Sequence, residues 1–532
     1  MLLSDLLGRG YFPRELPPPF STGSFSQHVE ASTVPAGFGL PPSSKHITLC
    51  STHNLARPSL LRRRLSIPNP IAYHQLAQFV VTNWASLHSR TEGSSISITT
   101  PQLAAGTERA IKRTNGFDAW PTQRARVRAG KRYILSADIL NFYPSIYTHS
   151  IPWAIEGKST AKKAKKSTTI GNSLDLIVRN GQDQQTVGIP IGPDTSLLLA
   201  EIILTAVDKS LPPQMSGGVR YVDDYEFGCN SYSEAESFLS TLQESLAIFE
   251  LQLNPRKTFI APLPLALERP WTPDLRLYDF RESQRGQAMD LIGYFGKAFQ
   301  LQPLYPDDSI LKYAVSRTRS ITVHPENWPL YEALLLQVAI VEPGTLSVVI
   351  EQLVRYARGG YEIDGDRVGN TFNQIVGTHS SIGHGSEVAW ALWGSIELEC
   401  KMGPIAAQRL SSSSDSIVAL LALDAHAKGL IDPALDTSSW QAEITKGGLR
   451  SSSWLLVYEA IRHNWLQIPK IGDPLDADPY FEWLRGGNVS FYNPHAVLVT
   501  EPLEGQATSP VPDTPPEISE QVTDIPDLEG YP

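Results

Sequence analysis

Alternating apolar and polar positions mark two short strands near the middle of the chain. In residues 219–228 the apolar positions fall on every second residue around one pair of acids, Asp223 and Asp224. An alternation of period two is typical of half-buried strands. The pattern therefore predicts a tight β-hairpin that carries two adjacent carboxylates at its tip. Aspartate is also a common turn former, so two solvated turn residues are the competing interpretation.

Other apolar patterns place further elements around this hairpin. Residues 133–139 are mostly apolar and predict a buried strand, and Ile71–His88 has the spacing of a helix. Asp194 is expected to cap a helix whose apolar residues recur on one face. Ser233 and Glu236 match a capping box at the start of another helix.

Strand signals fade in the second half of the chain, between about residues 305 and 495. Helices are expected there at 331–341, 346–356, 387–398, 416–427 and 454–465. No fixed-period sequence repeat accompanies them. We therefore predict an α+β part over residues 45–300, followed by an all-α helical array over residues 301–498.

Both ends of the chain differ in composition from these two parts. Residues 1–44 are rich in Pro, Gly and Ser, which favours an extended N-terminal arm. Residues 499–532 combine many prolines with eight acids and no Lys or Arg. Such a segment buries too little apolar surface to offset the entropy of ordering, so we expect a disordered tail.

The overall composition fits a large globular protein with several domains. The chain has 532 residues, of which 41% are hydrophobic and 19% are charged. No run approaches the roughly 18 apolar residues of a membrane helix, and the N-terminus has no secretory signal pattern. Its three cysteines are far apart and suggest neither disulfides nor a zinc knuckle. We expect a cytoplasmic protein that does not contact membranes.

The distribution of charge points to a nucleic-acid partner despite the net charge of −10. Residues 57–132 hold thirteen Lys or Arg against three acids, and residues 158–166 hold five lysines. A local basic surface can bind a phosphate backbone whatever the total charge. A solvated face without a partner is the alternative.

A third acid, Asp138, ends the predicted buried strand. A carboxylate at that place is costly unless it is hydrogen-bonded or neutralised. If this strand lies beside the hairpin, Asp138 and Asp223 converge, and their mutual repulsion favours a divalent cation. Hard oxygen ligands suit Mg²⁺ or Mn²⁺. Two such ions about 3.5–4 Å apart can stabilise both oxygens of an in-line phosphoryl transfer.

Two other kinds of site are not supported by their spacing. Residues 157–160 (Gly-Lys-Ser-Thr) end like a phosphate-binding loop, but Pro152 stands where that motif needs its first glycine. The histidines, His74, His149, His379 and His384 among them, show neither HExxH nor Cys/His spacing. No zinc site is expected from them.

The ordered set of motifs resembles the palm of a reverse transcriptase. Asp138, with an aromatic residue five positions later, resembles the first palm motif. The later motifs of that family resemble residues 188–192 (Gly-Ile-Pro-Ile-Gly), 221–224 (Tyr-Val-Asp-Asp) and 253–258 (Leu-Asn-Pro-Arg-Lys-Thr). Upstream, residues 63–68 (Arg-Arg-Leu-Ser-Ile-Pro) are similar to a fingers segment of the same family. The resemblance implies a right-hand polymerase palm and fingers over residues 45–300.

Further strings resemble prokaryotic reverse transcriptases of the abortive-infection and antiphage-defence type. They are residues 151–158, 192–196, 305–314 and 385–393, the last of which lies in the helical part. This resemblance covers about residues 45–495. It implies a role in defence against phage.

The resemblance also implies a role for each candidate residue. Asp138 and Asp223 would bind both metal ions, with help from Asp224 and from the main-chain carbonyl of Ile139. Tyr143 would stack under the incoming sugar and exclude a 2′-hydroxyl, although a core tyrosine is the alternative.

The remaining candidates would contact the nucleotide or the template. Arg63 and Arg64 would hold the triphosphate, but Arg62 is adjacent, so the choice among the three stays open. Lys257 would protonate the leaving pyrophosphate, unless it is only a solvated strand residue. Gly188 and Gly192 would let the backbone approach template or nucleotide, unless they are ordinary turn glycines.

Three functions follow from these observations. The first is RNA-templated DNA synthesis from dNTPs with Mg²⁺ or Mn²⁺, with RNA as template and DNA as product. The second is untemplated DNA synthesis at the same site, in some relatives primed by a protein tyrosine. The third is a non-catalytic RNA-binding or assembly protein. In each, the helical array could join two copies of the chain or hold a partner protein.

Overall fold

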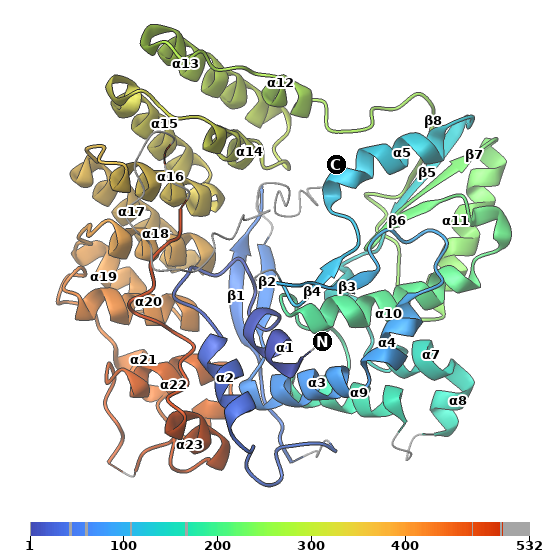
Figure 1. The fold of residues 1–532 in the computed structure, drawn as a ribbon, viewed down its shortest axis with the longest axis horizontal. Helices are drawn as coiled ribbons and strands as arrows, with labels where there is room; N and C mark the ends of the chain where they lie inside the picture. Colours follow the sequence, from blue (N-terminus) through green and yellow to red (C-terminus); the bar gives the residue numbers. More distant parts are fainter. Residues whose placement is uncertain are drawn as a thin grey trace.

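The computed structural model describes residues 2–41, 45–58, 62–106, 109–164, 169–470, 472–500 and 503. Two bodies of secondary structure flank the N-terminal segment (Figure 1). The sheet that carries the candidate acids lies at the right of the view, and helices of the second half of the chain form an arc at the left.

The central sheet has four antiparallel strands in the order β6-β7-β5-β8. Their bounds are Val219–Tyr221 for β6, Asp224–Cys229 for β7, Tyr133–Asp138 for β5 and Phe259–Pro262 for β8. The strand predicted over 133–139 and the hairpin predicted within 219–228 are therefore confirmed. The apolar run forms an inner strand of this sheet because β5 has neighbours on both sides.

Helices cover both faces of the sheet. Phe227 packs its ring against Phe238 of α11 (Tyr232–Ala247). A Cβ on the next residue, Gly228, would instead lie 2.3 Å from the carbonyl oxygen of Val127 in α5 (Trp120–Arg128). Since neighbouring strand residues point to opposite faces, α5 and α11 lie on opposite sides of β7.

The capping box of α11 begins two residues earlier than the sequence pattern suggested. The Ser231 hydroxyl accepts a hydrogen bond from the main-chain N–H of Glu234, and the Glu234 carboxylate accepts one from the N–H of Asn230. The predicted pair, Ser233 and Glu236, lies inside the helix. Both pairs fit the same spacing rule, so the pattern alone could not choose between them.

The remaining elements of the first half form two hairpins and a helical layer. The hairpins are β1 (Ser51–Ala56) with β2 (Arg62–Ile67), and β3 (Pro101–Leu103) with β4 (Ile111–Arg113). The helices are α3 (Pro70–Thr82), α4 (Trp84–Thr91), α6 (Phe142–Ser145), α7 (Ser150–Glu156), α8 (Lys158–Lys163), α9 (Ile170–Asn180) and α10 (Asp194–Ser210).

The helix predicted over Ile71–His88 is two helices in the structure. The break falls at Asn83, whose backbone leaves the helical region and whose side-chain amide donates to the carbonyl of Phe79. Asparagine competes for backbone hydrogen bonds in this way, which disfavours it inside helices. The apolar spacing continued across the break and concealed it.

The N-terminal segment is not the extended arm that its composition suggested. It contains α1 (Leu3–Arg9) and α2 (Gly23–Ala31). Tyr11 is buried, stacks on Tyr73 with ring centroids 4.1 Å apart, and donates its hydroxyl hydrogen to the carbonyl of Pro68. Aromatic burial of this size outweighs the loop-forming tendency of the Pro, Gly and Ser around it.

The second half of the described chain is helical, as predicted. Each of the five predicted helices overlaps an observed one. The helices are α12 (Thr272–Arg276), α13 (Gln284–Leu301), α14 (Ile310–Arg317), α15 (Trp328–Val341), α16 (Leu346–Arg358), α17 (Gly365–His379), α18 (Gly385–Glu397), α19 (Pro404–Leu410), α20 (Ser416–Ala427), α21 (Ser438–Ala442), α22 (Trp454–Arg462) and α23 (Pro479–Gly486). Helices near one another in sequence pack together, as α17 does with α18 and α18 with α20.

Two predictions concern the limits of these parts. The boundary at residues 300–301 falls at the end of α13 and stays a prediction. The acidic tail over 499–532 lies outside the described residues except for 499, 500 and 503. Among the described residues, no helix combines the length and apolar character needed to cross a bilayer.

Candidate active site

The register of the central sheet brings the three candidate acids together. Asp138 is the last residue of β5 and pairs directly with Asp224, the first residue of β7. The N–H of Ile139 donates to the carbonyl oxygen of Asp223 at 3.3 Å. Residues 85 positions apart in the chain therefore lie at one end of the sheet because two antiparallel strands end there.

The turn that carries Asp223 has an uncommon backbone conformation. Val222 has a φ of +51°, in the left-handed region that β-branched residues rarely adopt. Such a residue costs about 1–3 kcal/mol and persists only when its surroundings hold it. Its N–H donates to the hydroxyl of Thr99 at 3.1 Å, and its carbonyl accepts from Arg220 at 2.9 Å. Both the N–H and the carbonyl of Val222 are thus hydrogen-bonded within the protein.

Arg220 is fully buried and is held by two acids of α10. Its Nη2 lies 2.7 Å from Glu201 Oε1 and 2.7 Å from Asp208 Oδ2. Burial by itself lowers the pKa of the Arg220 guanidinium, but Asp208 and Glu201 raise this pKa well above its ordinary value. The group therefore stays charged and keeps donating to the turn that carries Asp223.

This ion network was not among the predictions from the sequence. The sequence signal for it is a pair of acids, Glu201 and Asp208, seven residues apart within a mostly apolar helix, which places both on one helix face. The second sequence signal is Arg220 itself, a charged residue between Val219 and Tyr221 in a predicted strand.

Asp138 has two further partners from the segment after α11. Asn254 donates its side-chain N–H to Asp138 Oδ1 at 2.9 Å, and Lys257 Nζ lies 3.3 Å from Asp138 Oδ2. Burial lowers the pKa of Lys257, while Asp138, Asp224 and Asp223 act in the opposite direction. The ammonium group of Lys257 therefore contacts Asp138 and is subject to the negative charge of all three acids.

This donor set fits a hard divalent cation. It offers three carboxylates at one end of a sheet, and Asp138 is buried. Carboxylate oxygens are the ligands that Mg²⁺ and Mn²⁺ prefer. Part of the negative charge is already balanced by Lys257.

The glycines of the predicted second motif have different surroundings. Gly188 and Gly192 have φ values of +90° and +132°, so both positions need glycine. The N–H of Gly188 donates to Ile146, directly after the short helix that carries Tyr143. A Cβ on Gly192 would lie 2.5 Å from Cγ of Pro13. At Gly192 the close neighbour in the structure is the N-terminal segment.

Arg109 ties that segment to the start of α10. It donates to the carbonyls of Phe12 and Gly192 at 2.6 and 2.7 Å, and to the Asp194 carboxylate at 2.6 Å. The Asp194 carboxylate also accepts from the N–H of Ile111. Asp194 is the first residue of α10 and does not accept a hydrogen bond from its own helix, so the predicted capping role is wrong.

A comparison with known protein families finds a match for the part of the chain that holds the candidate acids. Residues 68–276 match the family described as reverse transcriptase (RNA-dependent DNA polymerase). This segment is a reverse transcriptase domain. The match implies the palm and fingers fold of that family, and it makes the chain an RNA-directed DNA polymerase, which is a nucleotidyltransferase. A comparison with curated proteins found no match.

The reverse transcriptase domain, as matched, contains Asp138, Asp223, Asp224 and Lys257. Reverse transcriptases generally use divalent metal ions such as Mg²⁺, in agreement with the donor set. The helices from α13 onward lie outside the matched range.

The candidate arginines precede the reverse transcriptase domain by a few residues and lie on β2. Arg62 is bound by Glu387 of α18, with Nη1 and Nη2 each 2.5 Å from a carboxylate oxygen. Arg63 is half-buried and Arg64 is exposed. The choice of triphosphate ligand among the three arginines stays open, and Arg63 and Arg64 stay the predicted ones.

The lysine-rich segment is only partly described. Lys158 donates to the carbonyl of Ile248 at 3.0 Å, and its ammonium lies 4.1 Å from the ring centroid of Trp153. Lys165 and Lys166 lie outside the described residues. Lys158 thus has partners within the protein, and the predicted phosphate-binding surface here stays a prediction.

Proposed function

We propose that the chain synthesises DNA on an RNA template, with Asp138, Asp223 and Asp224 as the metal-binding acids. The observation that carries this proposal is the direct pairing of Asp138 with Asp224 inside a reverse transcriptase domain. The end of the sheet positions Asp138 and Asp224, and the anchored turn at Val222 positions Asp223, which suits a reaction that depends on geometry.

The candidate residues would bind either the metal ions or the triphosphate. Asp138 and Asp223 would hold Mg²⁺ or Mn²⁺, with Asp224 and the carbonyl of Ile139 completing the ligand set. When bound, such ions stabilise negative charge on the attacking and leaving oxygens. Arg63 and Arg64 would bind the triphosphate by bidentate hydrogen bonds.

Lys257 would act as the general acid that protonates the leaving pyrophosphate. Its burial beside Asp138 supports this role, because a lowered pKa makes a lysine a better proton donor near neutral pH. We expect Lys257→Arg to reduce kcat about 10²-fold, since arginine keeps the charge but does not release its proton.

The pH profile distinguishes proton donation from a charge effect. Deprotonation of Lys257 removes the acid as pH rises, and its lowered pKa brings that loss to a lower pH than for an ordinary lysine. Wild-type kcat should therefore fall on the alkaline side, and Lys257→Arg should lack this limb. An unchanged alkaline limb in Lys257→Arg would contradict the role.

Tyr143 would select deoxynucleotides. It is half-buried, and its main-chain carbonyl accepts from the N–H of Ile189, which ties it to the Gly188 turn. Tyr143→Val should increase the use of ribonucleotides relative to deoxynucleotides by about 10- to 100-fold, as expected when a pocket gains room. Competition assays with paired rNTP and dNTP check this, with the exposed Tyr232→Val as the control. An unchanged ratio would assign Tyr143 to the core instead.

The choice of template is tested by the products. Purified protein is incubated with dNTPs and Mg²⁺, with and without RNA, and the products are sequenced and tested for covalent attachment to protein. We expect DNA that is made only when RNA is present and that is complementary to this RNA. DNA made equally without RNA, above all DNA linked to a tyrosine, would favour untemplated synthesis. No DNA under any condition would favour a non-catalytic RNA-binding protein.

We further propose that this synthesis serves defence against phage. The support is the resemblance of residues 151–158, 192–196, 305–314 and 385–393 to reverse transcriptases of that type. The helices after α13 would then guide the product or bind a second copy or a partner. Cells expressing the wild-type chain should plate phage less efficiently than cells expressing Asp223→Asn. Equal plating across a broad phage panel would contradict the defence role.

A further inference from the structure

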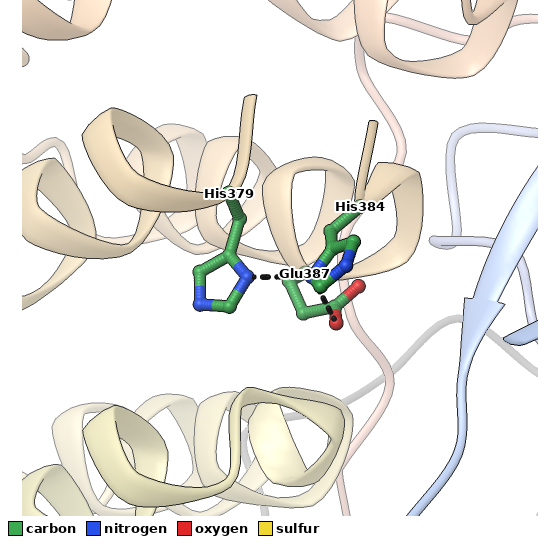
Figure 2. A group of neighbouring side chains, drawn as sticks. All are labelled: His379, His384 and Glu387. Atoms are coloured by element: carbon green, nitrogen blue, oxygen red, sulfur yellow. Dashed lines mark hydrogen bonds and ion pairs between the residues drawn. The ribbon is translucent and has the colours of Figure 1, made fainter. Parts of the chain in front are cut away.

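A second group of potential metal ligands lies in the helical part, far along the chain from the palm acids. His379 is the last residue of α17, His384 directly precedes α18, and Glu387 lies in the first turn of α18. Figure 2 shows the two imidazole rings facing each other with the carboxylate beside them. Their ligand atoms all lie within 4.8 Å of one another.

The connection between the helices creates this cluster. A short turn follows His379, and Gly383 has a φ of +70°, which reverses the chain. The N–H of His384 then donates to the carbonyl of His379 at 3.1 Å. The two histidines are five residues apart, a spacing that fits neither one helix face nor a known zinc motif. The sequence therefore gave no reason to expect a metal here.

The geometry fits one small cation. The Nδ1 atoms of His379 and His384 are 2.9 Å apart, and Nδ1 of His384 lies 3.5 Å from Glu387 Oε1. Tetrahedral Zn²⁺ binds nitrogen and oxygen at about 2.0–2.2 Å, which separates neighbouring ligand atoms by roughly 3.3 Å. The separations of 2.9 and 3.5 Å in the structure lie on either side of that value.

The protonation state suits metal binding. Burial lowers the pKa of His379 and that of His384, and the Arg62 guanidinium lowers both further, although Glu387 opposes this. Both rings are therefore neutral over a wider pH range, and neutral imidazole is the form that binds metals. Without a metal, the contact between the two Nδ1 atoms is a hydrogen bond in which one ring donates and the other accepts. With a metal bound, both Nδ1 atoms would instead be ligands.

We propose that His379, His384 and Glu387 bind a Zn²⁺-class transition-metal ion, with solvent in the remaining position. Two imidazoles and one carboxylate match the ligands that zinc takes in sites with an open position. They differ from the all-oxygen set of the palm, which suits Mg²⁺. The His384 side chain is 27% exposed, so solvent can reach the ion.

The proposed ion would bind a carboxylate, Glu387, that already pairs with Arg62 of β2. Arg62 of β2 contacts both oxygens of this carboxylate, and the Ser386 hydroxyl donates to Oε2 at 2.9 Å. A cation on Oε1 places a second positive charge beside Arg62 and weakens the Arg62–Glu387 pair. The site therefore lies where β2 meets α18, and metal binding there would loosen this contact.

The test measures metal binding by the full chain, whatever its polymerase activity. Chelator-treated protein is titrated with Zn²⁺ in excess Mg²⁺, and separately with Co²⁺, whose visible spectrum reports tetrahedral coordination. We expect one high-affinity Zn²⁺ per chain and a tetrahedral Co²⁺ spectrum. His379→Ala and His384→Ala should each weaken binding at least about 10²-fold and remove the spectrum, because second-sphere changes alone cost 10- to 100-fold.

A matched control separates the site from scattered surface histidines. His495 is exposed and lies outside the cluster, so His495→Ala should bind Zn²⁺ like the wild type. Melting temperatures in chelator, equal to that of the wild type, check that His379→Ala and His384→Ala fold. If either fails to fold, His379→Gln and His384→Gln take its place. Absence of stoichiometric binding, or binding that both cluster variants retain, overturns the proposal.

Discussion

Asp223→Asn is expected to reduce dNTP incorporation at least about 10³-fold, a loss of the size seen when a group that stabilises transition-state charge is removed. Asparagine keeps the shape of the side chain but removes the charge that would bind the cation. Asp138→Asn should have a similar effect, because its carboxylate pairs in register with Asp224 and accepts from Asn254 and Lys257.

The measurement is steady-state incorporation of labelled dNTP on a primed RNA template. Asp118→Asn serves as the matched control, since Asp118 is exposed in the same domain and should leave the rate unchanged. Thermal unfolding of each variant checks that the fold survives. An Asp223→Asn enzyme with more than a tenth of the wild-type rate would exclude Asp223 as a metal ligand.

Arg220→Met is expected to have the largest effect on stability. It leaves Glu201 and Asp208 buried without their main counter-charge, and breaking a buried ion pair in this way costs about 3–5 kcal/mol. It also removes the donor to the Val222 carbonyl. The free energy of unfolding should therefore fall by that amount, and activity should fall with it. The exposed Arg126→Met should change neither.

A compensated variant separates stability from positioning. Arg220→Met combined with Glu201→Gln and Asp208→Asn removes all three charges and should recover most of the lost stability. The Val222 carbonyl still lacks its partner, so kcat should stay low while KM for dNTP changes little. Recovery of full activity together with stability would show that Arg220 acts only on the fold.

Local pattern was sufficient for the elements nearest the candidate acids. The apolar run ending at Asp138 encodes β5, the alternation around Asp223 encodes the hairpin of β6 and β7, and β5 pairs with β7 as expected. The helices of the second half were also predictable, because their apolar positions repeat at helical spacing over several turns. Asp138, Asp223 and Lys257 converge because three elements end at the same side of one sheet.

The features that could not be predicted from the sequence depend on contacts between distant segments. Tyr11 is buried by stacking on Tyr73, which no local pattern in a Pro-rich segment reveals. Arg220 meets its acids only when β6 packs on α10, and His379 meets His384 only through the turn at Gly383. Such contacts are set by tertiary packing, which overrides local composition.

The most direct test of the account is whether the intact chain copies RNA. A DNA primer annealed to an RNA template is extended with dNTPs and Mg²⁺, and the experiment is repeated on a second template of different sequence. We expect DNA products that change with the template, require Mg²⁺ and disappear in Asp223→Asn. Products that keep the same sequence on both templates, or no extension by the wild-type chain, would contradict it.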